Sequence, residues 1–122
     1  NGEALALESA DAETPIAHSV AVLSDIQEAI DTMAEIVDRL NQDDVRYVIS
    51  TGDLTSNGTR EELLRFQEEL ERLDVPFYST VGNHEVPGPE NWHALFGPFS
   101  SFFVQHGVAV SLVDSLTNPS FK

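Results

Sequence analysis

The sequence contains no cysteine, which excludes disulfide bonds and thiolate zinc sites. Basic residues are also scarce, since 6 Lys and Arg stand against 21 Asp and Glu, a formal net charge of -15. So acidic a surface argues against general binding to nucleic acid or to anionic membranes. No apolar run is long enough to cross a bilayer, so we expect a soluble protein with no membrane partner.

The 122 residues are enough for one domain with a modest core. Residues 1–15 are small and acidic and are interpreted as a linker, and residues 16–122 as the domain. The linker has the character of a segment that follows a removed leader, which favours an exported or periplasmic protein.

Short apolar runs alternate with amphipathic stretches along the domain. Three short apolar runs are predicted strands: 18–23, 45–50 and 75–81. Two helices are predicted between them, one over 28–41 and one that starts at a capping box formed by Thr59 and Glu62. This order predicts an α/β fold whose parallel strands are joined by right-handed crossovers.

A short helix and a hairpin are predicted in the last part of the domain. The helix covers 91–96, and the hairpin strands are 101–105 and 108–113, with a turn at His106-Gly107. Aromatic residues of this part are interpreted as core or sheet cover rather than as a base-stacking surface: Trp92, Phe96, Phe99, Phe102 and Phe103.

Polar side chains follow each of the three predicted parallel strands, at the point where the strand ends. They are Asp25 and Gln27 after the first strand, Asp53 after the second, and Asn83 and His84 after the third. Because ligands gather outside the carboxyl ends of parallel strands, we expect these side chains to form one site.

The chemistry of these residues favours divalent metals and phosphate. Carboxylate and amide oxygens suit Mn²⁺ or Mg²⁺ better than Zn²⁺. Asp53 directly follows a glycine and can bridge two cations, and the further candidate ligands are Asp25, Gln27 and Asn83. Two cations about 3.5–4 Å apart clamp the attacking and leaving oxygens of a phosphoryl centre. His84 is predicted to protonate or stabilise the leaving oxygen.

Each of these residues also has a structural alternative. Asp53 alone would commonly cap the turn that follows it. Asp25 is compatible with an N-cap of the first helix, because Glu28 stands three residues later. Asn83 and His84 can be loop residues satisfied by backbone groups. The recurrence of such residues at three successive strand ends favours the functional interpretation.

Three motifs, in this order and spacing, resemble those of the calcineurin-like metallophosphoesterases: Ser-Asp-Ile-Gln at 24–27, Gly-Asp-Leu-Thr-Ser-Asn-Gly at 52–58 and Gly-Asn-His-Glu at 82–85. The resemblance runs from about Ile16 to Asp114-Ser115. It implies an α/β/β/α sandwich, of which this chain carries the parallel-sheet half, and a binuclear metal site. By position, Asp25 would hold one metal, Asp53 would bridge both and Asn83 would hold the other. His84 would be the catalytic imidazole on the substrate side.

Two departures from the family pattern bear on activity. The family has Asp-x-His at the first motif, where this chain has Gln27, and an amide oxygen in that place favours Mn²⁺ over Zn²⁺ or Fe³⁺. Branches that resemble the Mn²⁺-dependent ADP-ribose/CDP-alcohol diphosphatases carry Gln there. The family's later His and Gly-His-x-His motif do not occur in these residues. The chain is therefore interpreted as a truncated domain, weakly active or inactive, whose uncovered apolar sheet face predicts self-association.

The leading functional prediction is hydrolysis of phosphate mono- or diesters or nucleotide diphosphates with two divalent metal ions, Mn²⁺ favoured and Mg²⁺, Fe or Zn²⁺ as alternatives. The substrate would be a small phosphate ester or a nucleotide. The alternative is a non-catalytic α/β interaction module that has lost metal binding. A flavodoxin-like nucleotide binder also fits the order of elements. The acidic stretch 25–28 counts against it, because a phosphate-cradling loop is rich in Gly or Ser/Thr.

Overall fold

The computed structural model describes residues 18–105 and 107–117. In chain order the elements are β1 (Ser19–Leu23), the 3-10 helix η1 (Gln27–Ala29), α2 (Ile30–Gln42), β2 (Val45–Ser50), α3 (Arg60–Leu70), β3 (Phe77–Ser79), α4 (Pro89–Phe96), β4 (Ser101–Gln105) and β5 (Val108–Leu112). Within these ranges no helix has the length and apolar character needed to cross a membrane. The predicted linker at 1–15 and His106 lie outside the described residues.

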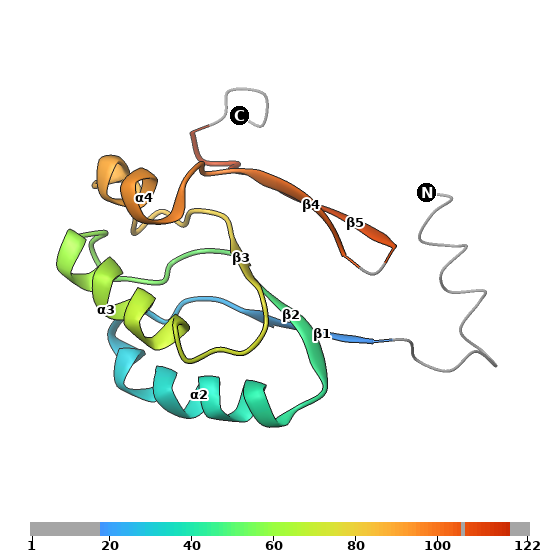
Figure 1. Cartoon of the computed structure of the whole chain (residues 1–122). Helices are drawn as coiled ribbons and strands as arrows, with labels where there is room; N and C mark the ends of the chain where they lie inside the picture. Colours follow the sequence, from blue (N-terminus) through green and yellow to red (C-terminus); the bar gives the residue numbers. More distant parts are fainter. Residues whose placement is uncertain (1–17, 106, 118–122) are drawn as a thin grey trace.

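The parallel sheet has the order β1-β2-β3 and confirms the α/β class. Its register aligns the strand ends, because Leu23 pairs with Ser50, and Ser50 pairs with Ser79. The strands run from the N-terminal side of the molecule towards α3 and α4 (Figure 1). The loops that follow the three strands therefore start from one row of residues.

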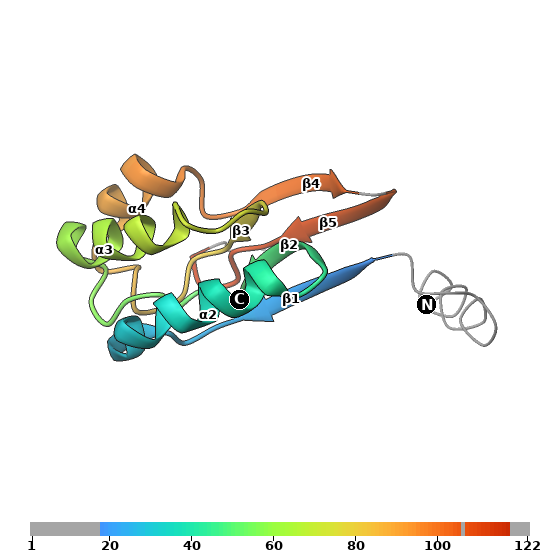
Figure 2. The same cartoon turned by 60° about the horizontal axis from the view of Figure 1, so that its bottom comes forward.

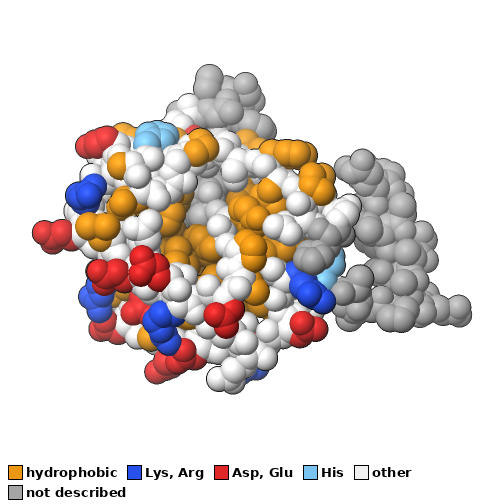
Figure 3. Space-filling model, in the orientation of Figure 1, with side chains coloured by type: hydrophobic (Ala, Val, Ile, Leu, Met, Phe, Trp, Pro, Cys, Tyr) orange, Lys and Arg blue, Asp and Glu red, His pale blue; other side chains and the backbone are white. Residues whose placement is uncertain are grey.

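Helices α2 and α3 supply the core on one face of this sheet. Their apolar stripes bury Met33, Val37, Leu63 and Phe66 completely, as the helical periodicity requires. The outer faces carry charge, and Arg65 and Arg72 of α3 pair with Asp31 and Asp38 of α2. These exposed ion pairs add little to stability. Figure 3 shows most of the acidic and basic side chains of this face over the helices, whereas hydrophobic side chains are spread over both the helices and the strands.

The β4–β5 hairpin covers the other face of the sheet (Figures 1 and 2). Phe103 of β4 stacks on Tyr78 of β3, with ring centroids 3.6 Å apart, and meets Tyr47 of β2 edge-on at 5.5 Å. Gln105 donates a hydrogen bond from Nε2 to the Tyr78 hydroxyl over 2.7 Å. The result is a helix layer, a parallel sheet and a two-stranded antiparallel layer, which is the first part of the predicted sandwich.

Phe102 is a correction to the expected core. Side chains alternate across a strand, so the neighbours of the inward Phe103 point outward. Phe102 and Val104 are accordingly 68% and 60% exposed, and the expectation that Phe102 packs in the core or covers the sheet is wrong. By contrast, Trp92 is completely buried, and Phe96 and Phe99 pack against the core.

Several predicted elements differ from the structure by one or two residues at their ends, and two of these differences have a clear physical reason. The third strand covers only Phe77–Ser79 instead of 75–81, although Thr80 still donates a backbone hydrogen bond to Ser50 O over 3.2 Å. Pro76 has no N–H, so the chain before Phe77 lacks a donor for the ladder. The first α-helix begins at Ile30 instead of 28, because the chain enters it through the 3-10 turn η1.

Candidate metal and catalytic site

The first strand end is held by the backbone of the second. Asp25 N–H donates to Gly52 O over 3.2 Å, and Gln27 N–H donates to Asp53 O over 3.4 Å. Asp25 and Gln27 both have positive φ angles, 57° and 42°. This left-handed backbone is uncommon outside glycine, so the cross-loop hydrogen bonds help to maintain it.

The N-cap alternative for Asp25 is wrong. Ile26 is the N-cap of η1 and Ala29 is the N-cap of α2, and neither helix has a side-chain cap. Asp25 Oδ2 instead accepts a hydrogen bond from the Ser24 hydroxyl over 2.6 Å. The carboxylate of Asp25 therefore does not serve the helix that follows it.

Asp53 lies where the three loops meet. Its φ is 54°, and it follows Gly52 with a φ of 103°. Its carboxylate oxygen Oδ1 accepts the backbone N–H of His84 over 3.0 Å. This bond crosses to the third loop instead of closing the turn after Asp53, which differs from the simple turn-cap alternative.

Two glycines allow the second and third loops to approach so closely. A Cβ on Gly82 would lie 2.0 Å from Asp53 Oδ1 and 2.2 Å from Asp53 N. A Cβ on Gly52 would lie 2.4 Å from Gly82 N. No side chain fits at either position, so contact requires glycine at both, and at Gly52 the φ of 103° requires it as well.

Glu85 is the site residue that sequence reasoning missed. Its side chain is completely buried. Oε1 accepts the N–H groups of Asp53 (2.9 Å) and Gly82 (3.1 Å). Oε2 accepts the N–H (3.1 Å) and the hydroxyl (2.9 Å) of Thr55. The available signal was only that a carboxylate stands inside the third motif.

The imidazole of His84 is oriented by the second loop. Nδ1–H donates to the carbonyl oxygen of Ser56 over 2.7 Å. This hydrogen bond raises the pKa of His84, and the negative charges of Asp53, Glu85 and Asp25 raise it further, against a smaller lowering by burial. The alternative that His84 is satisfied by a backbone group is therefore correct for Nδ1.

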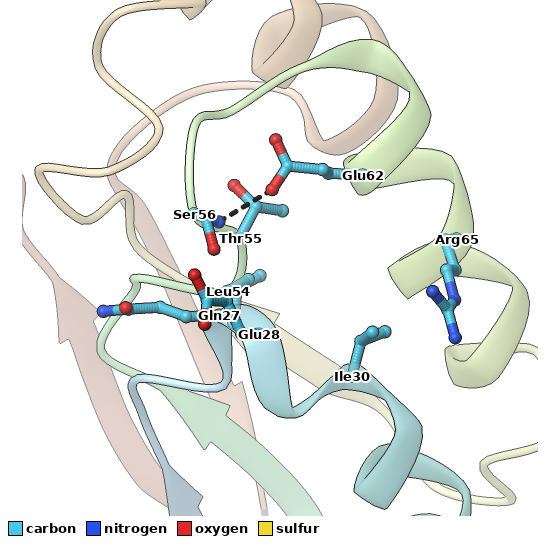
Figure 4. Close-up of a pocket in the computed structure, with 8 residues that line it drawn as sticks. All are labelled: Gln27, Glu28, Ile30, Leu54, Thr55, Ser56, Glu62 and Arg65. Atoms are coloured by element: carbon cyan, nitrogen blue, oxygen red, sulfur yellow. Dashed lines mark hydrogen bonds between the residues drawn. The ribbon is translucent and has the colours of Figure 1, made fainter.

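The remaining candidates lie on two sides of Asp53. Asn83 is exposed and lines a cleft of about 390 Å³ together with Asp53 and the segment after β5. Gln27 lines a separate cavity of about 280 Å³ between η1 and α3. In Figure 4 its amide group points away from Glu62 and Arg65, which form the far wall of that cavity.

A sequence profile of the calcineurin-like phosphoesterases matches residues 18–120. The chain belongs to this family. It is also 58% identical over 67 residues to a probable glycerophosphodiester phosphodiesterase GpdQ from Arcobacter nitrofigilis. That match covers 55% of this chain and 24% of the relative, so the chain spans about a quarter of the length of the relative it matches.

The calcineurin-like phosphoesterases generally use divalent metal ions, and the donors of this chain fit hard cations. The four candidate ligands offer two carboxylates and two amide oxygens. Within residues 18–105 and 107–117, no group of three or more His, Cys, Asp or Glu side chains is placed to hold a metal. The predicted ligand set has only two side chains of these four types, Asp25 and Asp53, because its other two members, Gln27 and Asn83, are amides.

Proposed function

We propose that this chain contributes the Asp25, Asp53 and Asn83 side of a binuclear phosphoesterase site. The reaction is hydrolysis of phosphate mono- or diesters, or of nucleotide diphosphates, with a small molecule or nucleotide as substrate. The observation that carries the proposal is the convergence of three strand-end loops on Asp53. Membership of the calcineurin-like phosphoesterases and the phosphodiesterase activity named for the matched relative support the same reaction class.

The metal-holding roles are those that the resemblance to the family implies by position in the three motifs. In this proposal Asp53 would bridge two ions, Asp25 and Gln27 would hold one of them, and Asn83 would hold the other. When bound, two divalent ions supply charge neutralisation at the phosphoryl centre and activation of the attacking water. The hard oxygen donors favour Mn²⁺ or Mg²⁺ over Zn²⁺.

His84 supplies the proton in this proposal. Its Nδ1–H is committed to Ser56 O, so the proton available for transfer is the one on Nε2. The Ser56 hydrogen bond, followed by the nearby carboxylates, raises the pKa of His84 and favours the imidazolium form. A charged imidazolium can protonate or stabilise the leaving oxygen of a phosphate ester.

We expect metal binding and turnover by these 122 residues to be weak. The predicted ligand set contains no imidazole and only two charged groups, the carboxylates of Asp25 and Asp53, to hold two divalent ions. The alternative function, a non-catalytic α/β interaction module, predicts that the purified chain holds no metal even after saturation with Mn²⁺. Metal analysis of the dialysed protein distinguishes the two.

The direct test is the Asp53→Asn variant, assayed with bis(4-nitrophenyl) phosphate across a Mn²⁺ titration. Asn keeps the size of the side chain and an oxygen that accepts the His84 N–H, but it removes the charge. Loss of one bridging ligand is expected to lower the rate by about 100-fold or more, since metal ions contribute several kcal/mol to such reactions. Asp43→Asn, an exposed change at the end of α2, is the matched control. Equal rates for wild type and Asp53→Asn would reject the proposal.

A further inference from the structure

We propose that Glu85 is a positioning residue that fixes the orientation of Asp53 and of the His84 backbone by holding the second and third strand-end loops together. The inference rests on the proposed function, because it concerns the placement of the residue to which metal bridging is assigned. It goes beyond the proposed function because it assigns a role to Glu85, which that proposal makes neither a metal ligand nor a substrate contact.

Burial of the carboxylate is the first reason. Glu is among the residue types that are almost never fully buried unless their groups are paired. The Glu85 side chain is completely buried, and its partners are the N–H donors of Asp53, Gly82 and Thr55 together with the Thr55 hydroxyl. All four hydrogen bonds go to the two loops that meet at Asp53. Glu85 therefore acts as an internal link between these loops.

The second reason is that the link is reciprocal. Glu85 of the third loop accepts the N–H of Asp53, and Asp53 of the second loop accepts the N–H of His84. We call this pair of hydrogen bonds the loop clasp. It fixes Asp53 at both its backbone N–H and its carboxylate, which is what its left-handed φ of 54° requires. Loss of one bond frees Asp53 to turn away from the third loop.

The third reason is that the position specifies a carboxylate. Oε1 accepts two backbone N–H groups and Oε2 accepts one. A backbone N–H can only donate, so each of these positions requires an acceptor. A glutamine would place its NH₂ group against at least one of them. Its remaining hydrogen bonds would also be weaker, because charge-assisted bonds are about twice as strong as neutral ones.

The test is the Glu85→Gln variant with two measurements. Amide hydrogen exchange in the metal-free protein is expected to accelerate at least about tenfold at Asp53 and at His84, whose N–H does not contact Glu85 itself. The dissociation constant for Mn²⁺, measured by calorimetry, is expected to rise by about 10- to 100-fold, the range typical of residues that orient metal ligands.

The control is Leu63→Val, which destabilises the buried core without touching the clasp. Its Mn²⁺ affinity is expected to stay within about twofold of wild type at a similar loss of thermal stability. Equal Mn²⁺ affinities in the two variants would overturn the positioning role, because Glu85 would then matter only for folding.

A second pair of variants decides the matter if Glu85→Gln does not fold. Thr55→Val removes the hydroxyl that donates to Oε2, and Thr55→Ser keeps it. We expect faster exchange at Asp53 and His84 in Thr55→Val but not in Thr55→Ser, and the same exchange in both would overturn the role. A wild-type chain that binds no Mn²⁺ would reject the proposed function alone, since the exchange of the His84 amide still tests the clasp.

Discussion

The loops at the carboxyl ends of the parallel strands and the outer face of the β4–β5 hairpin are built in opposite ways. At the loops, Glu85 is buried with four hydrogen bonds, and Gly82 touches Asp53 so closely that no Cβ fits. On the hairpin, Phe102 and Val104 are more than half exposed. One region holds backbone N–H groups of its loops by specific partners, whereas the other presents apolar side chains to solvent.

The difference teaches which region tolerates change. A packed polar network loses several partners when one group moves, because buried donors and acceptors are costly to leave unsatisfied. An exposed apolar side chain loses little when it is replaced, and its removal lowers the tendency to associate. Substitutions in the loops should therefore lower the free energy of unfolding, whereas substitutions on the outer face of the hairpin should leave it nearly unchanged and reduce self-association.

The largest effect is expected for Gly82→Ala. Its Cβ would lie 2.0 Å from Asp53 Oδ1 and 2.2 Å from Asp53 N, so one loop must move and the clasp must open. We expect a loss of unfolding free energy of about 3 kcal/mol or more, as in other cases of overpacking combined with broken hydrogen bonds. Denaturant unfolding followed by circular dichroism measures this loss.

Gly97→Ala is the matched control for that prediction. Gly97 has a φ of 86°, but a Cβ there would meet nothing within 4 Å. The cost at Gly97 is backbone strain alone, which Gly82 does not have, and at a φ of 86° with a ψ of -142° it amounts to about 1–3 kcal/mol. Equal losses of stability at Gly82 and Gly97 would show that the close approach of the loops is not what requires glycine at Gly82.

An intermediate effect is expected from the two faces of β4. Phe103→Ser removes the ring that stacks on Tyr78 and should cost about 2–3 kcal/mol, because most of a phenylalanine side chain leaves an apolar contact. Phe102→Ser should change the unfolding free energy by less than about 0.5 kcal/mol, since the residue is 68% exposed.

The same pair tests the predicted self-association. Size-exclusion chromatography with light scattering is expected to show a dimer or larger assembly for wild type and a smaller species for Phe102→Ser. The exposed apolar residues available for such contact are Val22, Phe102, Val104, Val108, Val113 and Leu116. A monomeric wild-type chain at all concentrations would contradict the prediction.

Much of the local structure was predictable because local signals decide it. The second strand was predicted at 45–50 and is observed at Val45–Ser50. The capping box of Thr59 and Glu62 is present in both of its hydrogen bonds. The meeting of the strand ends followed from parallel topology, since Leu23, Ser50 and Ser79 align in the register. The metal-ligand roles assigned to these loops stay predictions.

The parts that were not predictable depend on tertiary contacts. Phe102, Phe103 and Val104 are all apolar. The sequence of β4 therefore lacks the alternation of apolar and polar residues that identifies the inward face of a strand. The role of Glu85 in linking the loops was not predictable for another reason. Its burial arises only when the second and third loops meet, and no local pattern shows which backbone N–H groups those loops leave without helix or strand partners.

A smaller effect than that of Phe103→Ser is expected at Glu62, a half-exposed carboxylate that holds the second loop from its other side. Burial raises the pKa of Glu62, but hydrogen bonds from the N–H of Ser56, the hydroxyl and N–H of Thr59 and the N–H of Asn57 lower it by more, so the pKa lies below its ordinary value of 4.5. A depressed folded-state pKa contributes stability above the unfolded-state value, and this contribution disappears as pH falls through the folded-state value.

We therefore expect Glu62→Gln to lower the melting temperature at pH 7, by the equivalent of about 1 kcal/mol, as for other lost helix caps. The gap between variant and wild type should narrow as the pH falls below 4.5, the ordinary value of the carboxyl. Glu61→Gln is the control, because it removes the same charge from the first turn of α3 but leaves the bonds from the Glu62 carboxylate to the second loop in place. A gap that stays constant across this pH range, or that Glu61→Gln reproduces, would show that the hydrogen bonds of the Glu62 carboxylate do not anchor the second loop.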